Sequence, residues 1–88
     1  MRKLYATPTF DRLSRKFTEK NPYLKKKFNA VLKIIAKNVF DPLLKTHKLH
    51  GPLKEFYACR ISYDQRIVFS FDDEKVTLRG VGGHDDIY

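Results

Sequence analysis

The sequence contains little of what disulfide cross-links, secretion and membrane insertion require. It has one cysteine among 88 residues, so no disulfide can form within the chain. No apolar run approaches the roughly 20 residues that a transmembrane helix needs. A positively charged segment followed by an apolar run and small residues, the pattern of a secretory leader, is also missing. We therefore expect a cytoplasmic protein that does not span a membrane.

Acidic residues are scarce in the first part of the chain. Residues 1–60 contain 15 lysines and arginines against 4 acidic residues, residues 61–88 contain 3 against 6, and the formal net charge is +8. A basic surface of this kind attracts polyanions such as nucleic acid or ribosomes, because their binding releases counterions. The same lysines also fit the solvated faces of two helices, and charge alone does not separate the two interpretations.

The apolar content is sufficient for one folded domain. Apolar residues make up 42% of the chain and aromatic residues 14%, which suits a packed core and exceeds what a disordered polyelectrolyte contains. A chain of 88 residues has room for a single core. We therefore expect one domain spanning residues 1–88.

The first half of the chain predicts a short strand and two helices. Residues 4–6 are apolar and precede a Thr-Pro pair, which indicates a brief strand. A helix follows, capped by Thr7 or Thr9, and Asn21-Pro22 repeats the start signal for a second helix. Each helix carries one apolar stripe, which predicts a face packed in the core: Phe10, Leu13 and Phe17 in the first, and Leu24, Phe28, Val31, Leu32 and Ile35 in the second.

The second half predicts a long connection and three strands. Residues 43–52 have no periodicity and are expected to form a loop. Residues 55–61, 66–71 and 75–81 form strands separated by short turns, which predicts an antiparallel meander. The order β-α-α-β-β-β predicts an α+β fold in which two helices pack on one face of a small, mainly antiparallel sheet.

Meander geometry gathers several polar side chains at one end of this sheet. The turn after the first long strand and the exit of the third strand lie at the same end, so Arg60, Asp64 and His84 should form one patch with Tyr88 behind them. His47 and His50 enter from the opposite end of the strand, and they join the patch only if their loop folds back over the sheet.

A patch of arginine, aspartate, histidines and tyrosine suits acid–base cleavage of a phosphodiester. One group deprotonates a ribose 2′-OH, another protonates the leaving 5′-oxygen, and arginine stabilises the charge of the pentavalent transition state. A metal site built from His47, Asp64 and His84 is an alternative, although the spacing of a metal motif is missing. Cys59 lies in mid-strand and is expected to be a buried small hydrophobe instead of a nucleophile. Arg66 is expected to brace a carboxylate.

Three runs of residues resemble toxins of the RelE/ParE superfamily, with the YafQ-like branch nearest. They are His47-x-Leu49-x-Gly51, the segment Arg60-Ile61-Ser62-Tyr63-Asp64-x-Arg66, and the C-terminal Gly82-Gly83-His84-Asp85-Asp86-Ile87-Tyr88. The resemblance covers essentially the whole chain. It implies a toxin of a bacterial type II toxin–antitoxin pair, namely a metal-independent endoribonuclease without a cofactor that cuts mRNA in the ribosomal A site. It also implies silencing by a cognate acidic antitoxin.

The resemblance assigns roles one residue at a time. His47 matches the loop histidine before the glycine, Asp64 the acidic residue of the strand turn, and His84 the histidine that acts as acid or base. Tyr88 falls where the family keeps an aromatic residue that stacks on or orients an mRNA base. His50 is a further candidate for substrate binding.

Two departures from the family pattern concern the arginines. Arg60 stands where YafQ-like toxins carry a histidine, and it is similar to the arginine that other RelE-type toxins place on the scissile phosphate. Gly80 occupies the place of a catalytic arginine. Its neighbour Arg79 is a substrate-binding candidate, but strand alternation turns it to the other face unless a bulge re-aims it.

Two further functions remain open at this point. A ParE-like toxin shares the fold and poisons DNA gyrase by protein contact, but it has no use for a histidine and a tyrosine at the C-terminus. An inert member of the superfamily would survive as a module that binds an antitoxin or nucleic acid.

Overall fold

The fold consists of two helices and five strands in a computed structural model that describes residues 1–83. Residues 84–88 lie outside the described part of the chain. In chain order the elements are β1 (Lys3–Ala6), α1 (Pro8–Lys20), α2 (Lys25–Lys37), β2 (His47–Lys48), β3 (Tyr57–Arg60), β4 (Arg66–Phe71) and β5 (Lys75–Gly82). Short 3₁₀ turns at Pro22–Leu24, Pro42–Leu44 and Gly51–Leu53 are η1, η2 and η3.

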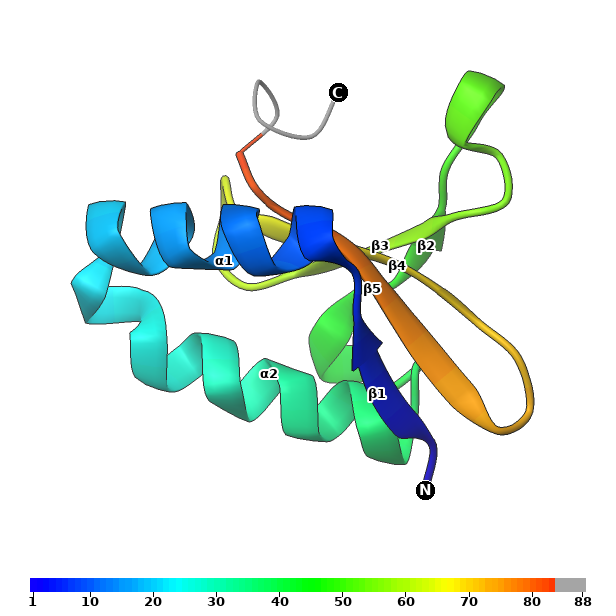
Figure 1. The fold of residues 1–88 in the computed structure, drawn as a ribbon. Coiled ribbons are helices and arrows are strands. Elements are labelled where there is room, and N and C mark those ends of the chain that lie inside the picture. The colour runs from blue at the N-terminus through cyan, green and yellow to red at the C-terminus, as the bar shows by residue number, and fades with distance from the viewer. Residues whose placement is uncertain (84–88) are drawn as a thin grey trace.

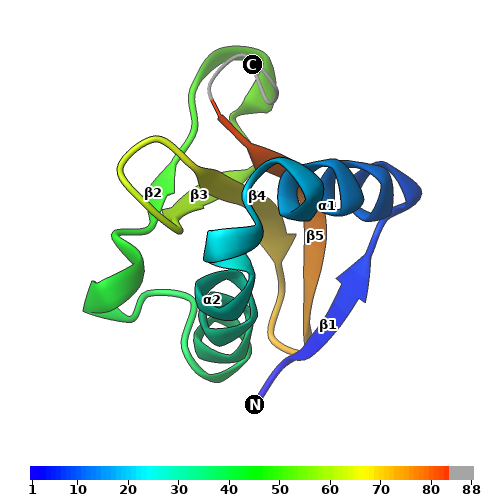
Figure 2. The same cartoon turned by 90° about the vertical axis from the view of Figure 1, so that its left-hand side faces the viewer.

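The strands form one sheet in the order β1-β5-β4-β3-β2. The pair β1 and β5 is parallel, and the other three pairs are antiparallel. Both helices lie on one side of this sheet, to its left in Figure 1 and in front of it in Figure 2. The predicted α+β architecture, with two helices on one face of a mainly antiparallel sheet, is confirmed.

The strand β2 was not expected from the sequence. Residues 43–52 were predicted to be a loop, but the chain forms the turn η2 there and then pairs His47 with Ala58 and Lys48 with Tyr57. A two-residue strand is too short to show alternation, so its pairing comes from the neighbouring strand and not from a local pattern. The pairing of His47 with Ala58 fixes His47 on the sheet.

Side-chain caps fix both ends of α1. The Thr7 Oγ1 accepts a hydrogen bond from the Phe10 N–H at 3.1 Å and donates one to the Leu78 carbonyl at 2.9 Å. At the other end, the Asn21 Nδ2 donates to the Phe17 carbonyl at 3.0 Å. Asn21 makes no side-chain cap for the following turn. The prediction that Asn21 starts the second helix is therefore wrong, because its side chain ends the first.

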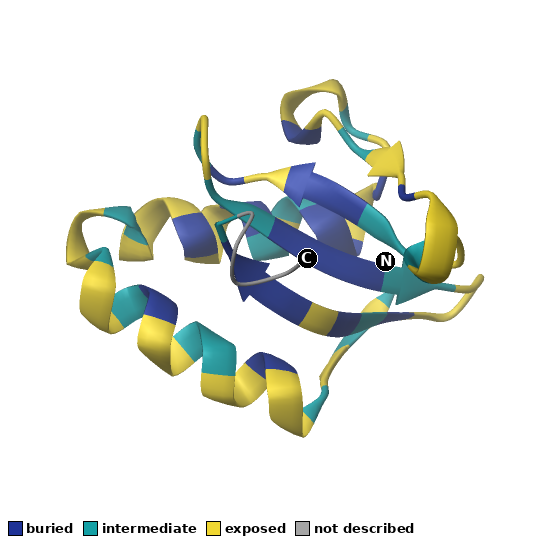
Figure 3. Cartoon of the chain, turned by 90° about the horizontal axis from the view of Figure 1, so that it is seen from above, coloured by how far each residue is buried: buried dark blue, intermediate teal, exposed yellow. Residues whose placement is uncertain are grey.

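The main core lies between the helices and the sheet. The predicted stripes supply Phe10, Phe17, Phe28, Val31 and Ile35 as buried residues, and buried bands alternate with exposed ones along both helices in Figure 3. Phe28 joins the two helices, since its ring centroid lies 6.2 Å from that of Phe10 and 5.4 Å from that of Phe17. Ring contacts at these separations are favourable beyond the area they bury.

The sheet face turned away from the helices, called here the outer face, carries only a small apolar cluster. It consists of Leu49, Ala58 and Val68, with Leu53 and Phe56 packed against them. On β3, Tyr57 and Cys59 belong to the main core, which confirms the predicted alternation. Polar residues, among them Arg60 and Arg79, share the outer face with this cluster. Among residues 1–83, no helix is long and apolar enough to span a membrane.

Candidate active site

Three strand ends meet at one end of the sheet, as the meander predicts. Arg66, the first residue of β4, pairs with Arg60 at the end of β3 and with Gly82 at the end of β5. The end of β5 at Gly82 therefore lies beside the β3–β4 turn. His84 and Tyr88, two of the predicted site residues, lie outside the described residues.

An open cleft of about 380 Å³ is present at this end, and it is lined by Arg60, Tyr63, Asp64 and Arg66. The Asp64 Oδ1 accepts a hydrogen bond from the Ser62 Oγ at 3.3 Å, and the Arg60 guanidinium carbon lies 6.0 Å from the centroid of the Tyr63 ring. Within residues 1–83, no carboxylate forms an ion pair with Arg66, contrary to the bracing role expected for it. Two guanidinium groups beside one carboxylate give the cleft a net positive charge, which suits a phosphate.

Arg79 lies on the outer face, next to a bulge in the strand β5. The register between β4 and β5 shifts at Val68/Phe69, which pair with Gly80 and Leu78 and leave Arg79 as the extra residue. The Arg79 Nε donates to the Ser70 Oγ at 3.2 Å, and its guanidinium carbon lies 5.2 Å from the Phe56 ring centroid. Arg79 thus follows the alternation that buries Val76 and Leu78 on the opposite face, and the bulge shifts the alternation after it, so that Val81 is buried in the main core.

Gly80 lies against α1. A Cβ at this position would contact the Leu13 Cδ1 at 3.5 Å, which is an ordinary van der Waals separation. A side chain at position 80 would therefore point toward α1 and away from Ser70 and Phe56. On the outer face of this strand, the guanidinium group comes from Arg79 and not from position 80.

His47 and His50 lie at different ends of β2. His47 pairs with Ala58, so it is a diagonal neighbour of Arg60 at a Cα separation of roughly 7 to 8 Å. Its exposed ring lies with Nδ1 3.4 Å from the Lys45 carbonyl oxygen. The expectation that His47 enters from the opposite end is wrong, because Lys45, just before β2, lines a groove together with Arg60. His50 follows β2 and lies away from the Arg60 end.

Cys59 is unsuited to nucleophilic chemistry. It is fully buried in the main core, and burial raises the pKa of its thiol to about 12. The neutral thiol is therefore the form present at physiological pH, in line with the predicted structural role.

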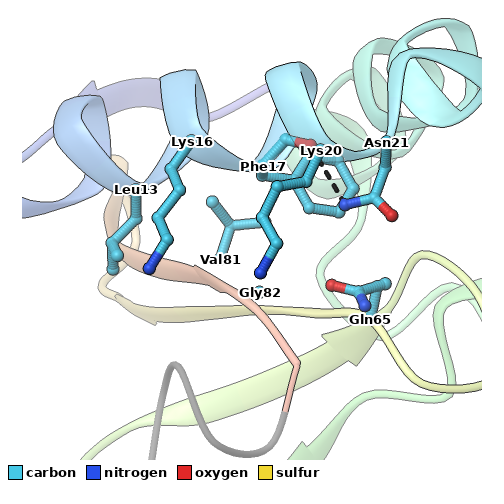
Figure 4. A pocket seen from close by; sticks show the side chains of 8 residues that line it. All are labelled: Leu13, Lys16, Phe17, Lys20, Asn21, Gln65, Val81 and Gly82. Carbon is cyan, nitrogen blue, oxygen red and sulfur yellow. Dashed lines mark hydrogen bonds between the residues drawn. The ribbon is translucent and has the colours of Figure 1, made fainter.

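Two lysines of α1 extend the positive charge toward the exit of β5. Lys16 and Lys20 line a small pocket of about 70 Å³ together with Gln65 and Gly82; the Lys20 side chain reaches from the helix toward Gly82, and that of Lys16 points toward the sheet beside Leu13 (Figure 4). Sequence reasoning did not select Tyr63 or these lysines. An aromatic residue between Ser62 and Asp64 in a polar turn is the one signal that could have indicated Tyr63.

The fold is similar to that of several solved toxin structures. The structure of YafQ from E. coli superimposes with a TM-score of 0.85 at 14% identity, covering 100% of this chain and 99% of that chain. A copper-bound mutant toxin from Helicobacter pylori gives a TM-score of 0.80 at 25% identity and 100% coverage of both chains. The YoeB-YefM complex from Staphylococcus aureus gives 0.77 at 26% identity, with 96% of this chain and 98% of that chain covered.

Sequence comparison gives the family directly. No curated protein sequence matches the chain. The sequence profile described as "Bacterial toxin of type II toxin-antitoxin system, YafQ" matches residues 2–88. This match spans nearly the whole chain, and the structural likenesses agree with it in fold. The protein therefore belongs to the YafQ family of bacterial type II toxins.

Proposed function

We propose that this toxin is a metal-independent endoribonuclease that cleaves mRNA in the ribosomal A site. The observation that supports the proposal is that Arg60, Arg79 and His47 share the outer face, and that Arg60 also lines the cleft together with Asp64. Guanidinium groups bind phosphate oxygens in bidentate fashion, and an exposed histidine near neutral pH transfers protons. These are the groups that phosphodiester cleavage by an internal nucleophile needs.

The proposed reaction uses the RNA's own 2′-hydroxyl. A base removes the proton of the 2′-OH, the 2′-oxygen forms a bond to the adjacent phosphorus, and the bond from phosphorus to the 5′-oxygen breaks. An acid gives a proton to the leaving 5′-oxygen, so the products are a 2′,3′-cyclic phosphate and a 5′-hydroxyl. His47 and His84 share the two proton transfers, and Asp64 supports them electrostatically.

The arginines stabilise the pentavalent transition state. Arg60 and Arg79 approach the scissile phosphate from neighbouring parts of the outer face, and each neutralises charge that develops as the 2′-oxygen attacks. The contacts of Arg79 with Ser70 and Phe56 hold its guanidinium in place before RNA arrives. Tyr88 stacks on an mRNA base, and His50 contacts RNA farther from the scissile bond.

The partners follow from the type of system. E. coli YafQ was solved in a toxin-antitoxin complex with DinJ, and S. aureus YoeB in a complex with YefM. By analogy, this toxin is silenced by a small acidic antitoxin encoded beside its gene. The formal net charge of +8 supports both an acidic partner and binding to the ribosome.

The test is induced expression with mapping of mRNA 5′ ends. The parent is expected to arrest growth and cut translated mRNA, whereas His84→Ala and Arg60→Ala should not. Lys75→Ala is the matched control, because Lys75 is a basic residue of the same sheet at the far end of β5. If both variants stayed as toxic as the parent, the assignment of Arg60 and His84 to the active site would be wrong. DNA damage signalling without mRNA cleavage would favour a ParE-like toxin that poisons DNA gyrase. Ribosome binding without mRNA cleavage would favour an inert member of the superfamily that only binds its partners.

A further inference from the structure

Tyr63, in the turn between β3 and β4, is the most exposed aromatic residue among residues 1–83. The exposed fraction of its side chain is 86%, against 78% for the next, Tyr23. Backbone hydrogen bonds order the turn, since the Ile61 N–H donates to the Gln65 carbonyl at 2.9 Å and the Gln65 N–H donates to the Ser62 carbonyl at 3.4 Å. An ordered turn therefore presents this ring to solvent.

The other described residues that line the cleft beside Tyr63 are all charged. They are Arg60, Asp64 and Arg66. The Arg60 guanidinium carbon lies 6.0 Å from the centroid of the Tyr63 ring, at the outer limit of a cation–π contact. An aromatic ring thus lies next to two arginines in a hollow that is open to solvent.

A nucleotide matches this combination of groups. It carries a flat base and a phosphate side by side, so a site that binds both needs an aromatic face next to a cation. Single-stranded RNA is recognised mainly through unpaired bases that stack on aromatic side chains, and arginine binds the phosphate. A protein partner would also cover an exposed tyrosine, but a hollow whose other side chains are charged, with two arginines among them, is typical of a nucleic-acid interface.

Tyr23 shows that exposure alone does not make such a site. It lies in η1 between the two helices, and its hydroxyl donates a hydrogen bond to the Asn21 Oδ1 at 3.3 Å. It is not among the described residues that line the cleft. The two tyrosines therefore differ in their position relative to the arginines of the cleft and much less in exposure.

We propose that Tyr63 forms a base-binding subsite, in which its ring stacks on the base of a nucleotide next to the scissile phosphate while Arg60 binds that phosphate. The inference rests on the proposed RNA substrate, and it assigns a stacking residue besides Tyr88. Every base has a π-face, so this subsite raises the affinity for single-stranded RNA without a strict sequence preference. It also orders the nucleotide whose phosphate reacts.

The test combines changes in the full toxin with changes in the RNA. The probe is a short single-stranded RNA whose 2′-hydroxyls are replaced by fluorine, so that it binds without being cut. Tyr63→Ala should raise the Kd of this RNA by about 5-fold to 100-fold, which is the range of one base–aromatic stack. An abasic nucleotide is then placed at each position in turn. At the position of the stacked base, the abasic RNA should bind the parent and Tyr63→Ala equally.

Three further variants separate stacking from other roles of the side chain. Tyr63→Phe keeps the ring and should keep the affinity of the parent, whereas Tyr63→Leu is apolar without a π-face and should bind as weakly as Tyr63→Ala. Tyr23→Ala is the matched control for an exposed tyrosine outside the cleft, and it should change Kd by less than about twofold. With 2-aminopurine in place of the stacked base, binding should quench the fluorescence in the parent and not in Tyr63→Leu.

Several results would overturn the subsite. One is an equal effect of Tyr63→Ala on the intact RNA and on every abasic RNA, because the tyrosine would then act without a base. Another is an unchanged Kd for Tyr63→Ala, even if this variant weakens binding of the antitoxin, and a third is a parent that does not bind the RNA. The RNA is not cut in this assay. If mapping of mRNA 5′ ends shows no cleavage by the parent, the nuclease function falls, and the measured affinities still decide the subsite.

Discussion

Arg79 lies on the outer face of the strand β5, opposite to the buried Val76 and Leu78. Its side chain donates a hydrogen bond to Ser70 there and lies over the Phe56 ring. Arg79→Ala should lower the rate of mRNA cleavage by about 100-fold to 1,000-fold with little change in ribosome affinity, because the lost contact forms in the transition state. Single-turnover cleavage on programmed ribosomes measures this rate. Arg79→Lys should keep the charge and recover part of the rate.

A double substitution tests whether position 79, and not position 80, carries the phosphate-binding guanidinium. In Arg79→Ala with Gly80→Arg, the new side chain begins against Leu13 of α1, and its Cβ does not face Ser70 or Phe56. We expect no recovery of the rate, together with a loss of stability of about 1 to 3 kcal/mol from overpacking. Full recovery of cleavage in the double variant would show that position 80 reaches the scissile phosphate.

Cys59 gives a stability prediction with a defined pH range. Burial raises the pKa of its thiol to about 12, whereas the thiol in the unfolded chain ionises near its ordinary value of 9.0. The raised pKa leaves the neutral thiol undisturbed below pH 9, and stability falls above pH 9 because the unfolded state releases its proton first. The loss approaches about 1.4 kcal/mol per pH unit. Urea unfolding between pH 8 and pH 10.5 should show that the parent's stability relative to Cys59→Ala declines over this range. A constant difference would contradict the assignment.

At the scale of elements, Thr7 joins α1 to the end of the sheet. Its hydroxyl caps the helix at Phe10 and donates to the Leu78 carbonyl of β5. Thr7→Ala should therefore lower the free energy of unfolding by about 1 to 2 kcal/mol, as measured by urea denaturation. Thr9→Ala is the control, since Thr9 is exposed in the first turn and should change stability by less than about 0.5 kcal/mol. Equal effects of the two substitutions would contradict the capping role.

The elements that the sequence predicts well are those in which a periodic pattern of apolar residues repeats over many positions. The stripes of α1 and α2 and the meander from β3 to β5 each repeat a pattern over several positions, so local alternation and turn residues suffice to place them. The meander also predicts that Arg60 meets the exit of β5, because two short turns leave no other arrangement. This part of the site follows from connectivity alone.

The missed features depend on single residues and on neighbours in space. The strand β2 has two residues and forms because β3 offers an edge, so it moves His47 to the site without any periodic signal. The bulge at Arg79 is one residue in eight, and alternation cannot predict where a register shifts. Asn21 precedes a proline like a helix start, but its side chain caps the preceding helix instead. Competing local interactions decide each of these cases.

At the scale of the whole molecule, the two ends of the sheet differ in charge balance. The cleft end carries Arg60 and Arg66 beside Asp64, whereas at the other end Arg2, Lys3 and Lys75 accompany Asp72, Asp73 and Glu74 of the turn between β4 and β5. In Figure 1 this turn lies at the lower right, away from α1 and the exit of β5. Hydrogen bonds from the Glu74 and Lys75 N–H groups lower the pKa of Asp72, and the charges of Lys75 and Arg2 lower it further. An excess of arginine at the cleft favours an orientation with the cleft toward a polyanion.

The salt dependence of RNA binding tests this orientation. A single-stranded RNA with a 2′-deoxy nucleotide at the scissile position binds without being cut, and its affinity should fall linearly on a log–log scale as salt rises. Arg60→Ala should reduce the slope by about 0.7, because it removes one phosphate contact. Lys75→Ala, which removes one positive charge at the other end of β5, should leave the slope unchanged. If Lys75→Ala lowered the slope as much as Arg60→Ala, net charge and not the oriented cleft would govern binding, and the two ends of the sheet would be equivalent to RNA.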